Sequence, residues 1–383
     1  MPILVLDPHL PPIPEDHVRV DIEVDRQRCG TIRPDVDQRL TDFEQHGLNV
    51  PISRLIAYSG IHSMGAVTDF WGRGIDVAQI HTTWSELAHC NPGAVPHRRT
   101  RKRKLVVDPG PNPRIAAFRS EMLGVGMALY IATRLYELPY RFWHPTGLAR
   151  WDLEGPARNG GRVKIEARAR LNRSGWKRAI QEVHAKFPPG GDFATAAGII
   201  FAPRTTANTR NADVMIVDPE GTERGTGHRD DLRALLLHYA PFFEVQGIRR
   251  VSYRLRQLSS ASRREFDQYL RSGDAELKSV RFHRTFFRTD AGIFLGTAWQ
   301  GTGWPPWLAH ATDFRPATGV FYWGLWEAVI QALREGRLED VSTMGVRETL
   351  SRLRSNVFIL LSDATALAWA PSEGQLYPSM LQT

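Results

Sequence analysis

The segment from Pro113 to Asp218 constrains the fold most, because its periodicity changes several times between helix and strand. Apolar residues recur at three- and four-residue steps from Ile115 to Ala132, as on the buried stripe of a helix. Residues 162–170 alternate instead between apolar and charged side chains, as a half-buried strand does. Such a segment predicts a mixed α/β layer rather than an all-helical or all-β fold.

The expected elements of this segment follow one another closely. They are a helix over 113–138, short strands over 140–144 and 150–154, a turn-rich stretch over 155–161, a strand over 162–170, a helix from Asn172 or Ser174 to Phe187, and strands over 194–202 and 212–218. The core stripe of the second helix is expected at Trp176, Ile180, Val183 and Phe187, beside a polar stripe of Lys177, Gln181 and His184. The order is therefore helix, hairpin, helix, strand.

Long flanking regions surround this core. A length of 383 residues suggests two or three domains, and we expect an α+β region over 1–100, a core over 101–225 and a mostly helical region over 226–383. The N-terminal region is expected to hold one strand from Val18 to Val24 and a helix over 36–47. The C-terminal region is expected to hold helices over 229–239, 318–334 and 344–355, and a strand with a basic face over 249–256.

Composition excludes several classes of protein. Hydrophobic residues make up 42% and charged residues 23%, which is ordinary for a globular chain and not for a disordered or fibrous one. Only Cys29 and Cys90 are present, which excludes a disulfide scaffold and a cysteine-based structural zinc site. No run reaches the ~18 apolar residues of a membrane span, and the acidic N-terminus does not resemble a signal peptide. We therefore expect a cytoplasmic protein without a membrane partner.

The charge is uneven along the chain. The net charge is +8, and residues 1–50 hold ten acidic and five basic residues (5 − 10 = −5), so residues 51–383 sum to 8 + 5 = +13. A basic body favours a polyanionic partner, DNA first, although arginine-rich codon usage would give the same balance. A basic run follows His97 and consists of Arg98, Arg99, Arg101, Lys102, Arg103 and Lys104. It is either a loop that contacts phosphates or a solvated linker.

Two carboxylates are placed for chemistry. Asp152 and Glu166 lie 14 residues apart on successive strands of the expected hairpin, so they can approach each other. A hard cation such as Mg²⁺ (or Mn²⁺) needs a few carboxylate oxygens and open positions for water and phosphate, and the Ala167 carbonyl could add a third oxygen. Arg168 shares the strand face of Glu166 and could stabilise charge on a phosphate. The alternative is an ordinary solvated strand face of Lys164, Glu166 and Arg168.

This arrangement resembles the PD-(D/E)XK nuclease superfamily, the fold of restriction endonucleases, over about residues 113–218. The resemblance implies a restriction-endonuclease-like mixed sheet flanked by helices, with Asp152 and Glu166 as metal ligands. It further implies that Glu121 is a helix carboxylate aimed at the site and that Gln181 lies on the supporting helix. The implied function is metal-dependent DNA endonuclease activity, in prokaryotic restriction or phage defence, with a homodimer or partner subunits as the assembly.

Two residues depart from the family pattern. Trp151 stands where the motif has proline, and Arg168 stands where it has lysine. Arginine stays protonated in proteins and cannot act as a general base, so Lys164, two residues before Glu166, is the expected source of an ammonium group. The alternative function is a catalytically inactive protein that keeps the nuclease fold to bind nucleic acid or to act as a scaffold.

Overall fold

The computed structural model describes residues 17–27, 32–52, 54–55, 57–59, 93–96, 103–106, 113–146, 152–156, 162–170, 175–187, 195–201, 213–217, 228–280, 285–289, 292–302, 318–344, 349–353, 356–370 and 380–381. Contacts divide the chain into two units. The central unit contains the described residues of 15–73 and 90–231, and the C-terminal unit contains those of 232–383. Whether residues 1–100 and 226–383 fold as separate regions stays a prediction.

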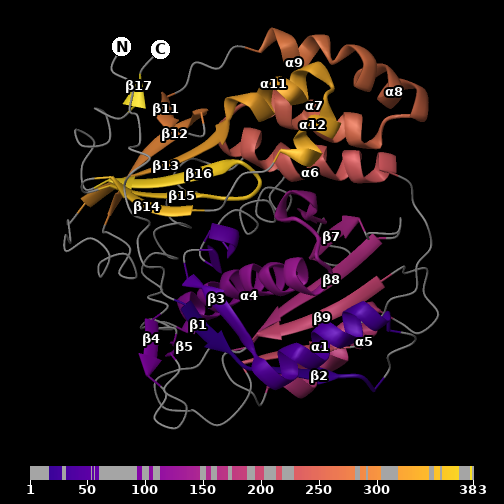
Figure 1. The fold of residues 1–383 in the computed structure, drawn as a ribbon, viewed down its shortest axis with the longest axis vertical. Helices are drawn as coiled ribbons and strands as arrows, with labels where there is room; N and C mark the ends of the chain where they lie inside the picture. Colours follow the sequence, from indigo (N-terminus) through magenta and orange to yellow (C-terminus); the bar gives the residue numbers. More distant parts are fainter. Residues whose placement is uncertain are drawn as a thin grey trace. The chain divides into compact units, whose positions relative to one another are not determined.

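The central unit is built on a mixed six-stranded sheet (Figure 1). Its strands, in spatial order, are β2 (Ile22–Asp25), β10 (Val214–Val217), β9 (Thr195–Phe201), β8 (Arg162–Ala169), β7 (Leu153–Pro156) and β6 (His144–Pro145). The pairs β2–β10 and β8–β9 are parallel and the other pairs are antiparallel. The expected mixed α/β class is thereby confirmed, and β8 matches the strand predicted from its alternation.

Helices cover both faces of this sheet. Alternation along β8 turns Ala169 toward α4 (Pro113–Leu135), because a Cβ built on Gly124 of that helix would lie 2.7 Å from the Ala169 Cβ. On the other face, a Cβ built on Gly198 of β9 would lie 2.4 Å from Val183 Cγ1 of α5 (Trp176–Lys186). Gly198 pairs with Glu166, so α5 packs on the face that carries Glu166 and Arg168.

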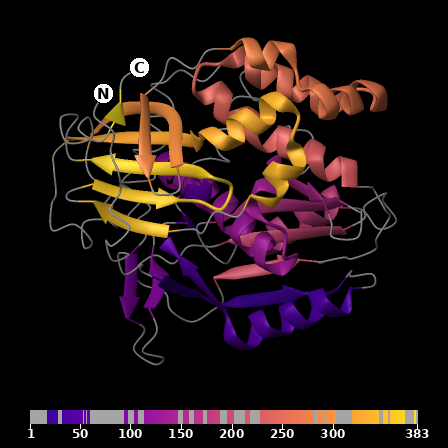
Figure 2. The same ribbon diagram turned by 45° about the horizontal axis from the view of Figure 1, so that its top comes forward.

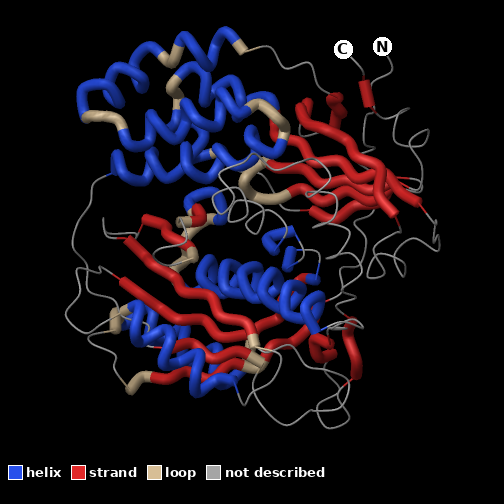
Figure 3. The backbone as a smooth tube through the Cα atoms, turned by 180° about the vertical axis from the view of Figure 1, so that it is seen from behind, coloured by secondary structure: helices blue, strands red, loops and turns tan. Residues whose placement is uncertain are grey.

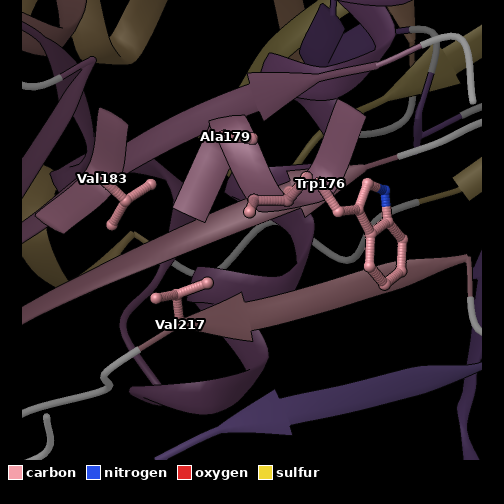
Figure 4. Close-up of a cluster of buried hydrophobic side chains, with 5 residues drawn as sticks. Trp176, Ala179, Val183 and Val217 are labelled. Carbon is pink, nitrogen blue, oxygen red and sulfur yellow. The ribbon is translucent and has the colours of Figure 1, made fainter. Parts of the chain in front are cut away.

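A compact apolar cluster holds α5 against the sheet. Figure 4 shows Trp176, Ala179 and Val183 of the helix together with Val217 of β10. Ile200 of β9 completes the buried set, and Ile180 and Phe187 pack against it while partly buried. The helix therefore has a fixed rotation about its axis, which determines the residues that it presents to Glu166.

Adding a methyl group at Gly198 tests this close packing. Gly198→Ala is expected to lower the free energy of unfolding by about 1–3 kcal/mol, because the new Cβ would overlap the Val183 side chain and also lie 3.1 Å from its Cβ. Urea denaturation followed by circular dichroism measures the change. An unchanged midpoint would mean that α5 does not rest on β9 as described.

The N-terminal strand differs from the prediction of one strand from Val18 to Val24. It is two strands, β1 (His17–Val20) and β2, which belong to different sheets. At Asp21 between them, the backbone N–H donates to Asp213 Oδ2 at 3.0 Å and the carbonyl accepts from the Asp213 N–H at 2.8 Å. Uninterrupted alternation cannot reveal such a change of sheet, because both strands keep the same period.

A second, four-stranded sheet completes the central unit. Its order is β3 (Leu48–Pro51), β1, β5 (Arg103–Val106) and β4 (Gly93–Pro96). Helix α1 (Pro34–His46) confirms the helix expected over 36–47. The stretch 140–144, expected as a strand, is a 3₁₀ turn (Tyr140–Phe142) followed by the two residues of β6.

The C-terminal unit contains a seven-stranded antiparallel sheet. Its order is β14 (Thr349–Leu353), β15 (Asn356–Leu360), β16 (Thr365–Ala370), β13 (Thr318–Trp326), β12 (Gly292–Thr302), β11 (Thr285–Thr289) and β17 (Met380–Leu381). Figure 2 shows the neighbouring strands of this sheet side by side. The helices are α6 (His228–Val245), α7 (Arg249–Ser260), α8 (Arg263–Ser272), α9 (Ala275–Ser279), α11 (Glu327–Glu335) and α12 (Leu338–Thr343). Figure 3 shows these helices as one group beside the strands.

The expectation of a mostly helical C-terminal region is therefore wrong, although α6 confirms the helix expected over 229–239. The helix expected over 318–334 is β13 followed by α11, because a continuous apolar run fits a buried strand as well as a helix. The helix expected over 344–355 is replaced by β14. The strand expected over 249–256 is α7, in which Val251, Leu255 and Leu258 are buried at helical spacing.

None of the helices among the described residues is long and apolar enough to span a membrane.

Candidate active site

The β7–β8 hairpin brings the two predicted carboxylates together. Leu153 pairs with Ile165, and the Asp152 N–H donates to the Ile165 carbonyl at 3.0 Å, so Asp152 lies beside Glu166 across the two strands. The side chain of Asp152 is fixed by the Ala167 N–H, which donates to Asp152 Oδ2 at 2.8 Å. Glu166 is fully buried, whereas the Asp152 side chain is 34% exposed and forms the accessible rim of the pair.

One guanidinium group contacts all three oxygen-bearing groups expected to hold a metal. Arg168 Nη1 lies 3.7 Å from Asp152 Oδ2 and donates to the Ala167 carbonyl at 3.1 Å, while Arg168 Nη2 forms an ion pair with Glu166 Oε1. The oxygens of Asp152, Glu166 and Ala167 therefore converge on a single cation. This convergence is the geometry that a shared metal ion would need.

Helix α5 adds two charged residues that the sequence did not single out. Lys186 Nζ donates to Glu166 Oε2 at 2.8 Å, and Glu182 Oε2 lies 3.3 Å from Arg168 Nε. Glu182 also pairs with Arg170 and with Arg178. The helix pattern contains a signal for both residues, because they flank the buried residues Trp176, Ala179 and Val183 of α5.

The remaining predicted site residues lie elsewhere. Glu121 is exposed on α4, which covers the opposite face of the sheet, and Gln181 is exposed on α5; no described contact joins either residue to the two carboxylates. Lys164 shares the face of Glu166 but is paired with Glu154 in the strand register. In the basic run, Arg98, Arg99, Arg101 and Lys102 lie outside the described residues, and Arg103 and Lys104 belong to β5.

Burial and mutual repulsion favour the protonated forms of the carboxyl pair. Burial, and then the charge of Asp152, raise the pKa of Glu166 to about 7, against the opposing effect of Lys186 and Arg168. The surrounding protein also raises the pKa of Asp152, although Arg168 and the Ala167 N–H oppose this. Two cations therefore do not fully compensate the two carboxylates, and a further cation at this position would be stabilised.

This raised pKa predicts a pH dependence of stability. The folded protein binds the Glu166 proton more tightly than the unfolded chain, whose glutamate pKa is 4.5, so the free energy of unfolding falls as the pH rises from about 4.5 to about 7. The loss should approach about 3 kcal/mol, at 1.36 kcal/mol for each pKa unit. Urea denaturation across this pH range should show the decline in the wild type and a much smaller one in Glu166→Gln. Parallel curves for the two proteins would contradict it.

The donor set fits a hard divalent cation with few protein ligands. Within the described part of the chain, no group of three or more His, Cys, Asp or Glu side chains is arranged to hold a metal. The site offers two carboxylates and one main-chain carbonyl, which suits Mg²⁺ or Mn²⁺ with several waters retained. Glu166 Oε1 is buried and forms the ion pair with Arg168 Nη2, so a metal ion bound there would replace this guanidinium contact.

Comparisons with protein-family models, with curated proteins and with solved structures give no match to this chain. The candidate site is thus defined by its geometry alone.

Proposed function

We propose that this protein is a metal-dependent nuclease that hydrolyses phosphodiester bonds in DNA, with a restriction-endonuclease-like central unit. The observation that carries the proposal is the convergence of Asp152, Glu166 and the Ala167 carbonyl on one cationic group, beside Lys186. Helices on both faces of the mixed sheet, with the hairpin between them in the chain, are compatible with that fold. A setting in prokaryotic restriction or phage defence is the corresponding biological proposal.

The chain would divide the chemistry among five residues. Asp152, Glu166 and the Ala167 carbonyl would hold Mg²⁺, which when bound supplies Lewis-acid stabilisation and a water of lowered pKa. Lys186 can both donate and accept a proton, which Arg168 cannot, so the amine of Lys186 is the group placed to exchange a proton with the attacking water. Arg168 would move off the carboxylates and stabilise charge on the phosphate.

Glu182 gives Arg168 a second position. It already lies 3.3 Å from the Arg168 Nε, so the guanidinium can stay paired with Glu182 after it leaves Asp152 and Glu166. The arginine therefore need not become an uncompensated charge when a metal enters.

Supercoiled plasmid incubated with the purified full chain tests the proposal directly. Nicked or linear DNA is expected with Mg²⁺ or Mn²⁺ and not with EDTA. Absence of cleavage with both metals, over a range of pH and of substrates including RNA, would contradict the nuclease proposal.

A second candidate function is a non-catalytic nucleic-acid-binding or scaffold protein. The observation that favours it is Arg168 itself, which already occupies the position of the expected metal and carries a permanent positive charge. Arg168→Lys separates the two candidates, because the shorter ammonium group restores the family residue and vacates part of the site. Cleavage that is gained by Arg168→Lys and absent from the wild type would support the scaffold.

A further inference from the structure

A strongly basic surface lies on the helical part of the C-terminal unit. Helices α7, α8 and α9 pack together there (Figure 1). Residues 249–280 contain eight Lys and Arg and four Asp and Glu, a net charge of 8 − 4 = +4. Some of these charges form ion pairs within the unit.

Three of the four acidic residues of this region cap helices or pair with arginines within it. Glu265 forms a capping box with Ser262 at the start of α8. Asp274 caps α9 through the Leu277 N–H at 2.9 Å and also accepts from Arg254, and Glu276 pairs with Arg250. Few carboxylates are therefore left for the other arginines.

Three arginines on α8 keep their charge uncompensated. Arg263, Arg264 and Arg271 are exposed and form no ion pair or hydrogen bond with any residue that the structure describes. They line a surface hollow of about 700 Å³ together with Asp267, Gln268 and Ser272. The described lining thus carries three positive charges and one negative charge.

The position of two of these arginines has an energetic cost. Arg263 and Arg264 lie in the first turn of α8, where the helix dipole is already positive and an added positive charge is unfavourable. The capping box occupies the N–H groups of Ser262 and Glu265, and the arginine side chains supply the positive charge of the hollow. An anion in the hollow would turn this repulsion into attraction.

The chemistry of the surface fits a phosphate backbone best. A guanidinium group can donate two hydrogen bonds to the oxygens of one phosphate, and the Gln268 amide adds a neutral donor of the kind that commonly contacts phosphate and sugar. From Arg263 to Arg271 the helix rises about 12 Å, which is enough to follow about three phosphates of one strand. A membrane surface fits less well, because Phe266 and Tyr269 are buried within the unit and only Leu270, which is half-buried, remains as an apolar residue of α8.

We propose that the exposed face of α8, formed by Arg263, Arg264, Gln268 and Arg271, binds the phosphate backbone of a nucleic acid. This surface would hold the nucleic acid through the C-terminal unit while the central unit acts on it. That the bound nucleic acid is the substrate rests on the proposed function. The binding itself requires no catalysis.

Fluorescence anisotropy of a short labelled DNA duplex, with the full chain in EDTA, tests the surface. The triple variant Arg263→Ala, Arg264→Ala, Arg271→Ala is expected to bind roughly tenfold or more weakly at moderate salt. Its slope of log affinity against log salt should be shallower by about 3, at about 0.9 for each lost phosphate contact. Arg178→Ala, Arg250→Ala, Arg337→Ala together form the control, because they remove the same charge from exposed arginines that are already paired.

Each result separates the inference from its alternatives. An equal loss of DNA binding in the control variant would show a general charge effect and would contradict the proposal. The proposal would also be contradicted if the triple α8 variant bound DNA like the wild type but lost binding to phosphatidylserine-rich vesicles or to an acidic protein. Glu166→Ala is expected to bind DNA like the wild type. If the wild type cleaves nothing while the α8 variant still loses binding, the proposed function fails and the α8 surface stands.

Discussion

Glu166→Ala is expected to reduce metal-dependent DNA cleavage below detection, by about 10³-fold or more. Glu166 supplies the buried carboxylate of the proposed metal site. Its loss would leave Asp152 as the one proposed carboxylate ligand. A Lewis acid is worth several kcal/mol to such a reaction, and each 1.36 kcal/mol is a factor of ten in rate. Single-turnover cleavage of plasmid with Mg²⁺ and with Mn²⁺ gives the rate.

Folding must be separated from chemistry in this experiment. Glu166→Ala leaves Lys186 without its carboxylate, so Glu166→Gln, which preserves the shape of the side chain, should be measured beside it. Glu154→Gln is the matched control, since Glu154 is also a buried carboxylate on the hairpin and pairs with Arg162 at 2.7 Å. Glu154→Gln should keep most of the activity. Full cleavage by a folded Glu166→Gln variant would exclude Glu166 as a metal ligand.

The hairpin was predictable because its information is local. Alternation over 162–170 identifies the strand and places Glu166 and Arg168 on one face, and the short turn brings Asp152 to the same face. No distant part of the chain is needed for this step. The predicted proximity of the two carboxylates could therefore be stated from two strands alone, whereas their role in catalysis stays a prediction.

Lys186 and Glu182 were not predictable in the same way, because they reach the site through tertiary packing. Their position depends on the rotation of α5, which the contacts of Ala179 and Val183 with the sheet determine. The family resemblance favoured Gln181 on this helix, and Gln181 is exposed. The resemblance also favoured Glu121, but the pattern of α4 identifies a buried stripe and not the face of the sheet against which that stripe packs.

Larger errors arose where one pattern fits two structures. The alternation over 249–256 also places Val251, Leu255 and Leu258 on one side of a helix, and the helix is formed. The apolar run from residue 318 contains aromatic and β-branched residues that favour a strand, but its continuity hid the boundary between β13 and α11. In both segments, contacts with other elements determine whether the chain forms a helix or a strand.

Lys186→Ala is expected to slow DNA cleavage by about 10²–10⁴-fold without weakening DNA binding comparably. This range is typical for the loss of one general acid or base. Lys186 is the amine that contacts Glu166 in the structure, whereas Lys164, the lysine expected from the sequence, is paired with the position of Glu154. Lys164→Ala should therefore cost much less, and Lys177→Ala, on the exposed side of the same helix, should cost nothing measurable.

Substituting arginine for Lys186 distinguishes the two roles open to this amine. Arginine keeps the positive charge beside Glu166 but cannot release a proton near neutral pH. If Lys186 exchanges a proton with the attacking water, Lys186→Arg should be nearly as slow as Lys186→Ala. If Lys186 serves only to offset the charge of Glu166, Lys186→Arg should recover most of the rate. Should Lys164→Ala prove the slower of the two alanine variants, the lysine of the catalytic site would be the one on β8, and the contact between α5 and Glu166 would be structural.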